Sequence, residues 1–274
     1  MEAVKKEHPV NGECLYISNG YVEAVIPLSF GIRITHFSLC GKDNLFYEDP
    51  ADRPNFSTEE GWRLRGGYRV WAAPEGPWDY VPDNSPISWR AEGETLFLSE
   101  RPDPRTGFRK KMEVTLLGNG IKVKGVLQNI SDHDTDAAVW LVSSVVPGGV
   151  EIIPLPYSGN DTPRVGFCYW DHTDPSDERI KYGRDRLEIR SLPSDRPLKI
   201  GISHPAGPVR YELGSVSLIK RYDLDTDAVY PDKNSSWETY FCRHMTELES
   251  LSPLYTVRPG CEISHTEELL IETL

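Results

Sequence analysis

The segment MEVTLLGNGIKVKGVLQN, residues 112–129, indicates most clearly which class of fold the chain adopts. Apolar and polar residues alternate on both sides of a short glycine-containing stretch, which is the period of a strand with one buried face. The residues that share this face are Met112, Val114, Leu116, Ile121, Val123 and Leu127. Gly118-Asn119-Gly120 is typical of a tight turn, and Lys122 and Lys124 point to water. The segment therefore predicts a β-hairpin.

The same alternation recurs along the whole chain, between clusters of Gly, Pro, Asn and Asp. The clearest further strands are YVEAVIPL (21–28), GIRITHFSL (31–39), AVWLVSSVV (138–146), LKIGISH (198–204), SVSLIKRY (215–222), WETYFCRH (237–244) and CEISHTEELLIETL (261–274). With 22 Gly and 22 Pro, long helices have little room, and only DPSDERIKYGRDR (174–186) is compatible with a short one. Because neither a linker nor an internal repeat divides the chain, we expect one all-β domain over residues 1–274, an antiparallel sandwich.

Composition limits the functions that the chain can have. Thirty basic against 42 acidic residues give a net charge of −12, so general attraction to nucleic acid or to an anionic membrane is not expected. The first residues lack the apolar run of a signal peptide, and no stretch is long enough for a transmembrane helix. Five scattered cysteines without CxxC spacing indicate reduced thiols in the cytoplasm and neither a disulfide framework nor a zinc site: Cys14, Cys40, Cys168, Cys242 and Cys261.

The stretch GGYRVWAAPEGPWDYVPDN, residues 66–84, is rich in aromatic and charged side chains. On a strand, Arg69 and Trp71 point to the same side, opposite to Tyr68. An arginine donates to sugar hydroxyls in a fixed fork and an indole stacks on the C–H faces of a sugar, so the pair suits a carbohydrate. The alternative is structural, with Trp71 in the core and Arg69 paired with Glu75. The next loop can place three further residues at the rim of a pocket, although ordinary loop packing also explains them: Trp78, Asp79 and Tyr80.

A second signal is the acidic strand HMTELESL, residues 244–251. Glu247 and Glu249 share one face, about 6.6 Å apart at Cα from the rise of a strand. If they are shielded from water, the repulsion between them raises the pKa of one carboxyl, as a general base or acid requires. The alternative for an isolated Glu-x-Glu is a pair of solvated surface acids.

Four segments in order resemble the galactose mutarotase-like, or aldose 1-epimerase-like, proteins. They are LYISNGYVEAVIPLSFGIRITHFSLCGKDNLF (15–46), GGYRVWAAPE (66–75), YPDKNSSWETYF (230–241) and MTELESLSPLYTVRPGCEISHTEELLIETL (245–274). The last three are similar to a branch that usually reads Gly-Gly-His-Arg-hydrophobic-Trp and ends in Glu-hydrophobic-Glu, Leu-x-Pro-Leu and Pro-Gly. The resemblance implies a β-supersandwich of antiparallel strands and a carbohydrate ligand, but a fold does not determine an activity.

The resemblance also implies roles for individual residues. Epimerases of this superfamily place a catalytic base in a late strand before a Pro-Gly turn, where Glu249 and Glu247 stand here. Their histidine acid belongs to a His-x-Tyr-Phe-Asn motif, but the corresponding stretch here, AVWLVSSVVPGG (138–149), has no histidine. His172 and His244 remain as possible acids, although a lone histidine is more often structural. Around the substrate we expect Arg69, Trp71, Tyr68, Glu75 and His244, with Tyr68 in place of the usual histidine.

No sequence motif calls for a metal or a cofactor. DLDTDAVYPDKN, residues 223–234, begins like a calcium loop, but Ala228 replaces the required glycine and Asn234 the bidentate glutamate. Asp232 and Glu238 are nevertheless candidates to join Glu247 in an acidic pocket. Three functions stay open: an epimerase acting at C1, a carbohydrate-binding protein without turnover, and, third, a glycosidase or lyase, which needs a further acid facing the glutamate strand.

Overall fold

The computed structural model describes residues 2–50, 60–159, 161 and 165–274, and nearly all of its regular structure is strand. The largest sheet has ten strands in the order β14 (Ile180–Tyr182), β15 (Arg186–Arg190), β12 (Val150–Pro154), β17 (Val209–Leu213), β18 (Val216–Tyr222), β22 (Glu262–Thr273), β10 (Gly120–Asn129), β9 (Phe108–Leu117), β8 (Thr95–Ser99) and β7 (Ser88–Glu92). An antiparallel all-β fold, as the alternation predicted, is confirmed by these pairings.

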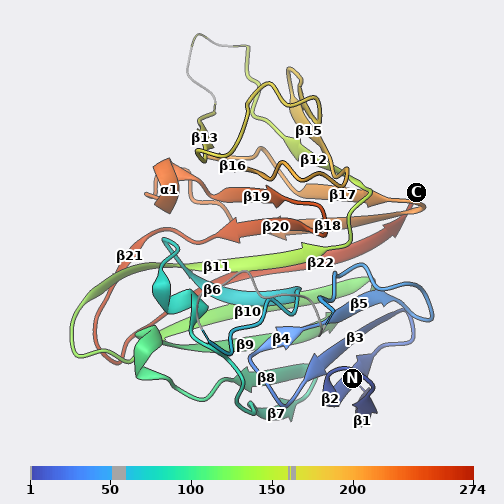
Figure 1. Cartoon of the computed structure of the whole chain (residues 1–274), viewed down its shortest axis with the longest axis vertical. Coiled ribbons are helices and arrows are strands. Elements are labelled where there is room, and N and C mark those ends of the chain that lie inside the picture. Colours follow the sequence, from blue (N-terminus) through green and yellow to red (C-terminus); the bar gives the residue numbers. More distant parts are fainter. Residues whose placement is uncertain (1, 51–59, 160, 162–164) are drawn as a thin grey trace.

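A second sheet of eight strands packs against the first (Figure 1). Its order is β13 (Phe167–Tyr169), β16 (Leu198–Ile202), β19 (Trp237–Phe241), β20 (Thr246–Leu251), β11 (Thr135–Val145), β6 (Gly67–Ala73) and β4 (Arg33–Ile34), with β21 (Tyr255–Val257) paired to β11. A smaller sheet follows the order β1 (Glu2–His8), β2 (Gly12–Ser18), β3 (Val22–Pro27) and β5 (His36–Leu39).

The hairpin predicted at residues 112–129 lies within the ten-stranded sheet. Leu117 pairs with Gly120, so Gly118 and Asn119 form the turn between β9 and β10. The apolar face is buried except for Leu116, which is half-buried, while Lys122 is exposed. Because β10 also pairs with β22, the hairpin joins the strands on both sides of it into one sheet.

Contact between the two large sheets forms the core. At Gly125 of β10, a Cβ atom would stand only 2.5 Å from the side chain of Leu141 on β11, so the absence of a side chain allows the sheets to approach. Tyr68 and Val70 of β6 belong to the same buried cluster. Strand alternation then turns the intervening residues, including Arg69, to the face of the eight-stranded sheet that is directed away from the core. We call this the outer face.

Glu151 is an acid buried between the sheets. Glu151 of β12 accepts a hydrogen bond from Trp237 Nε1 (2.9 Å), and its other oxygen lies 2.6 Å from Thr239 Oγ1. Thr239 Oγ1 also lies 3.1 Å from the carbonyl oxygen of Glu247. The Thr239 hydroxyl donates to Glu151, so each carboxyl oxygen of Glu151 accepts one hydrogen bond. Burial raises the pKa of Glu151 to about 8, and the hydrogen bonds from Thr239 and Trp237 oppose this shift.

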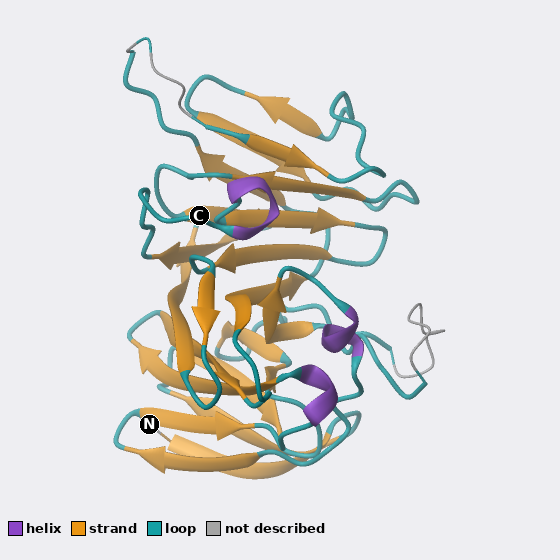
Figure 2. Ribbon diagram, turned by 90° about the vertical axis from the view of Figure 1, so that its left-hand side faces the viewer, coloured by secondary structure: helices purple, strands orange, loops and turns teal. Residues whose placement is uncertain are grey.

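Helical structure in the described residues is limited to short turns that lie outside the sheets (Figure 2). They are η1 (Pro77–Tyr80), η2 (Pro104–Thr106) and α1 (Pro231–Asn234). None of these helices has the length and apolar character needed to cross a bilayer. In α1, three consecutive residues have left-handed φ angles, namely Asp232 (48°), Lys233 (63°) and Asn234 (72°), so this turn is strained. The backbone N–H of Tyr230 donates a hydrogen bond to Asn234 Oδ1 (2.8 Å), which holds the turn together.

A short helix within residues 174–186 is contradicted, since this segment forms turns followed by β14. Asp174 accepts a hydrogen bond from the backbone N–H of Ser176 (2.8 Å). Asp177 accepts another from that of Arg179 (3.0 Å) and also pairs with the Arg179 guanidinium (2.9 Å). Such local side-chain bonds compete with a helix and stabilise turns.

Candidate functional site

The outer face of the eight-stranded sheet carries a compact group of charged and aromatic side chains. Arg69 Nη2 lies 2.9 Å from Glu247 Oε1, and Arg69 Nη1 donates to Ser144 Oγ at 3.2 Å. Ser144 in turn donates to the same Glu247 oxygen at 2.8 Å. The Arg69 guanidinium stands 4.1 Å from the centre of the Trp71 ring. The ion-pair partner of Arg69 is thus Glu247 on β20, and not Glu75 as the structural alternative supposed.

A second ion-pair group adjoins the first. Glu238 of β19 stands directly opposite Glu249 of β20 in the strand register. Lys199 of β16 bridges them, with Nζ 2.9 Å from Glu238 Oε2 and 3.4 Å from Glu249 Oε2. Trp140 Nε1 donates to Glu249 Oε2 at 2.9 Å. Lys199 Nζ also lies over the rings of Trp140 and Trp170, at 4.5 and 4.7 Å from their centres.

These two groups define the outer-face cluster, which consists of Arg69, Trp71, Trp140, Ser144, Lys199, Glu238, Glu247 and Glu249. The sequence predicted that Arg69 and the two glutamates of β20 lie together, and the structure places them so. Lys199, Trp140 and Ser144 were missed. Their strands were recognised, but which strands are neighbours depends on pairings between distant parts of the chain.

Burial and mutual charge set the protonation of the cluster. Burial raises the pKa of Glu238 well above its usual range, and it also raises the pKa of Glu249, while Lys199 opposes both shifts. For Lys199, burial opposes the charge, but Glu249 and Glu238 outweigh it and raise the lysine pKa. We therefore assign a charged Lys199 and one proton shared by the two carboxyls near neutral pH. Glu238 holds this proton, because the hydrogen bond from Trp140 favours ionised Glu249.

The loop after β6 covers one side of the cluster. Tyr80 packs against Trp71 and Trp62, with ring centres 5.7 and 5.3 Å apart, and its hydroxyl donates to exposed Glu75. The charge of Glu75 acts on both Lys199 and Glu249, so Glu75 lies at the boundary between the cluster and solvent.

The two residues before Tyr80 have other places. Asp79 is buried and accepts hydrogen bonds from the backbone N–H groups of Ala72 (3.3 Å) and Gly76 (3.1 Å), which hold the loop in position. Trp78 lines a separate hollow of about 310 Å³ together with His133. Of the three rim candidates, Tyr80 alone packs on an aromatic residue of the cluster.

The remaining predicted residues lie farther from the centre of the cluster. Tyr68 is fully buried between the sheets, where burial and nearby Glu267 raise its pKa, and this placement argues against contact with a substrate. His172 is exposed, and its ring packs edge-on against Tyr240 at 6.3 Å. His244 is exposed in the turn between β19 and β20, and its charge acts on Asp195.

Asp232 was predicted to share an acidic pocket with Glu238 and Glu247. Glu238 lies in the cluster, through Lys199, and the charge of Asp232 contributes to the raised pKa of Glu238. The charge of Asp232 thus acts on Glu238, but the residue itself lies at the edge of the cluster, on the strained turn α1.

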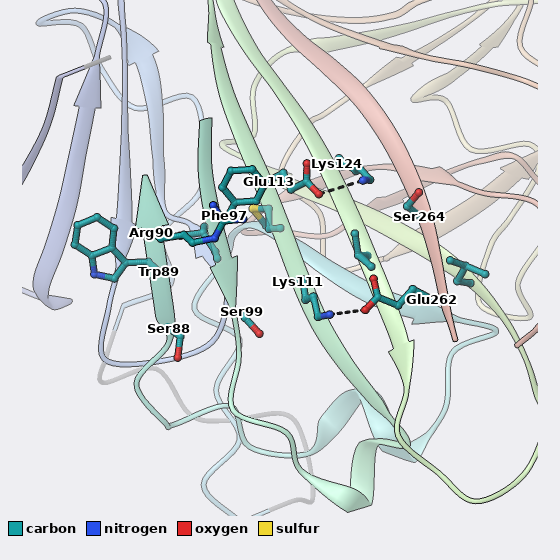
Figure 3. A pocket seen from close by; sticks show the side chains of 14 residues that line it. Ser88, Trp89, Arg90, Phe97, Ser99, Lys111, Glu113, Lys124, Glu262 and Ser264 are labelled. Carbon is teal, nitrogen blue, oxygen red and sulfur yellow. Dashed lines mark hydrogen bonds and ion pairs between the residues drawn. The ribbon is translucent and has the colours of Figure 1, made fainter. Parts of the chain in front are cut away.

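A groove of about 400 Å³ lies elsewhere, on the solvent face of the ten-stranded sheet (Figure 3). It runs over β7, β8, β9, β10 and β22, with ion pairs between Lys111 and Glu262 and between Lys124 and Glu113. The charged residues of the groove alternate along β9 and β10 with residues of the core, so they point away from the eight-stranded sheet. The groove and the outer-face cluster therefore lie on opposite sides of the sandwich. Both glutamates labelled in it are paired with lysine (Figure 3).

The fold defined by these sheets is that of the galactose mutarotase-like β-sandwiches. The chain is similar to the Slr1438 protein of Synechocystis, with a TM-score of 0.64 and 12% identity over 95% of this chain and 96% of that one. It is similar also to galactose mutarotase-like proteins from Lactobacillus casei (TM-score 0.61, 10% identity, 94% and 100% covered) and Clostridium acetobutylicum (0.57, 11%, 100% and 99%). No protein-family model and no curated protein matches the sequence. Identities this low show the shared fold alone.

Proposed function

We propose that the protein binds a carbohydrate at the outer-face cluster and interconverts its anomers in the manner of an aldose 1-epimerase. The observation that carries the proposal is the meeting of Arg69, Trp71, Glu247 and Glu249 on one face. A guanidinium, an indole and carboxylates are the groups that recognise sugar hydroxyls and the C–H faces of a sugar ring. The fold of the neighbouring structures, two of which are described as galactose mutarotase-like, supports the same ligand class.

The reaction needs a base and an acid. The base removes the proton of the C1 hydroxyl, the acid protonates the ring oxygen as its bond to C1 breaks, and the ring closes again on the other face of the aldehyde. Glu247 is held by Arg69 and Ser144, whereas Glu249 Oε1 accepts no hydrogen bond within the described part of the chain. This difference favours Glu249 as the base. Two groups can supply the proton, namely protonated Glu238 and, at the rim, His172.

A sugar-binding protein without turnover is the second candidate. In its favour, Arg69 is 4% exposed and Glu249 1% exposed, and both already have partners within the cluster. Binding needs only hydroxyl partners and an aromatic platform, whereas epimerisation needs two proton-transfer groups on one ligand.

Calorimetric titration with neutral hexoses, followed by NMR measurement of anomer exchange, tests the proposal. Binding together with faster exchange than in buffer supports an epimerase, and binding without acceleration supports the second candidate. Arg69→Ala is expected to weaken binding about ten- to a hundredfold, from the loss of a charge-assisted hydrogen bond. The matched control is Glu113→Gln in the groove of Figure 3, which also removes one side of an ion pair. Equal affinity of the folded Arg69→Ala protein and wild type would contradict this placement of the site.

A further inference from the structure

The outer-face cluster has more carboxylates than cations. Its ionisable groups, with Glu75 at the boundary, are Arg69, Lys199, Glu75, Glu238, Glu247 and Glu249. Without exposed Glu75, the buried cluster has two cations and three carboxyls, so its charge is 2 − 3 = −1 with all carboxyls ionised and 0 with Glu238 protonated. Charges inside a poorly solvated site interact far more strongly than charges in water. A cationic ligand can therefore take the place of the proton on Glu238, whereas a phosphate would add negative charge beside Glu247 and Glu249.

Glu238 and Glu249 share one lysine and, near neutral pH, one proton. Lys199 lies against the Oε2 atom of each. Their Oε1 atoms are buried and accept no hydrogen bond from any residue that the structure describes. Both side chains are 1% exposed, and unpaired buried acceptors are costly, so this arrangement calls for a donor that the described chain does not supply.

We propose that the ligand of this site is an amino sugar, whose ammonium group binds between Glu238 Oε1 and Glu249 Oε1. The two glutamates are direct cross-strand neighbours, so their carboxyl groups can share one ammonium as they already share Lys199. An ammonium has three donors and matches two acceptors plus one further partner. The C1 hydroxyl then lies beside Glu249, and the other sugar hydroxyls face Arg69 and Glu247. This inference rests on the proposed function, because it names the substrate class of the same site.

The test compares ligands that differ in one group. Wild-type protein is titrated near neutral pH, at constant ionic strength, with glucosamine, galactosamine, their parent hexoses, N-acetylglucosamine and glucose 6-phosphate. At least one amino sugar is expected to bind about ten- to a hundredfold more tightly than its parent hexose, from a charge-assisted hydrogen bond. N-acetylglucosamine, which lacks the charge, is expected to lose this gain, and glucose 6-phosphate to bind most weakly.

A variant locates the ammonium. Glu238→Gln keeps the shape of the side chain but cannot ionise when the ammonium binds, so the advantage of the amino sugar over its parent hexose is expected to fall about tenfold or more. Glu113→Gln on the opposite face is expected to leave the advantage unchanged. Because the comparison is a ratio of two affinities, a general loss of stability in a variant does not imitate the result.

Three outcomes overturn the inference, and they can be told apart. If neutral hexoses bind and amino sugars bind no better, the substrate class is wrong while the proposed carbohydrate site stands. If none of the sugars binds, the proposed function fails and the inference fails with it. An amino-sugar advantage that survives in folded Glu238→Gln would show that the ammonium binds elsewhere.

Discussion

Breaking the ion pair between Arg69 and Glu247 should destabilise the protein strongly. Arg69 is 4% exposed, and its Nη2 atom lies 2.9 Å from Glu247 Oε1. Arg69→Met keeps much of the volume but leaves Glu247 with the hydroxyl of Ser144 as its described partner. Removing one partner of a buried pair costs about 3–5 kcal/mol, since a charge stays buried without compensation. Ser144→Ala removes hydrogen bonds but no charge and should cost about 1 kcal/mol.

The assay is urea unfolding followed by fluorescence and circular dichroism. With a slope of about 3 kcal/mol per molar urea, Arg69→Met should lower the midpoint by about 1–2 M. The double variant Arg69→Met/Glu247→Gln should be more stable than Arg69→Met alone, because it leaves no uncompensated charge. A cost below about 1 kcal/mol for Arg69→Met, or a double variant that loses the full sum of the single costs, would refute the description of Arg69 and Glu247 as a buried, coupled pair.

Three further predictions concern catalysis, pH and cooperativity. Glu249→Gln should slow anomer exchange 10²–10⁴-fold, the usual contribution of a general base, and an unchanged rate in the folded variant would reject Glu249 as the base. Glu151 is protonated in the fold up to about pH 8 but ionises near pH 4.5 when unfolded, so its contribution to stability falls as pH rises between these values. The free energy of unfolding of wild type should therefore fall, relative to that of Glu151→Gln, by up to about 1.4 kcal/mol per pH unit over this range. Parallel curves of unfolding free energy against pH for the two proteins would contradict this. The whole chain should unfold in one transition, as expected of a single domain, whereas two separately protease-resistant fragments would show independent units.

The strand pattern was predictable from local sequence, because a half-buried strand must alternate apolar and polar residues. This is why the hairpin of β9 and β10 was recognised, and why Arg69 and Trp71 were expected on one face. The helix expected within residues 174–186 was wrong, because Asp174 and Asp177 bond to nearby backbone N–H groups and stabilise turns.

Strand neighbours were not predictable from local pattern. Lys199 is a charged residue in an otherwise apolar strand, LKIGI, and this oddity was the one signal that it has a buried partner. Its partners Glu238 and Glu249 come from strands about 40 to 50 residues later, so the bridge depends on sheet order. The protonation of the cluster also depends on burial. From the sequence, a raised pKa for Glu247 or Glu249 could be predicted only on the condition that the two carboxyls are shielded from water.

The most direct test of the account is a crystal structure of the protein with the monosaccharide that binds most tightly in the titrations. We predict the sugar on the outer face, within hydrogen-bond distance of Arg69 and Glu249 and beside the ring of Trp71. A well-ordered sugar found only in the groove over β7 to β10 and β22, with the outer-face cluster unchanged, would contradict it.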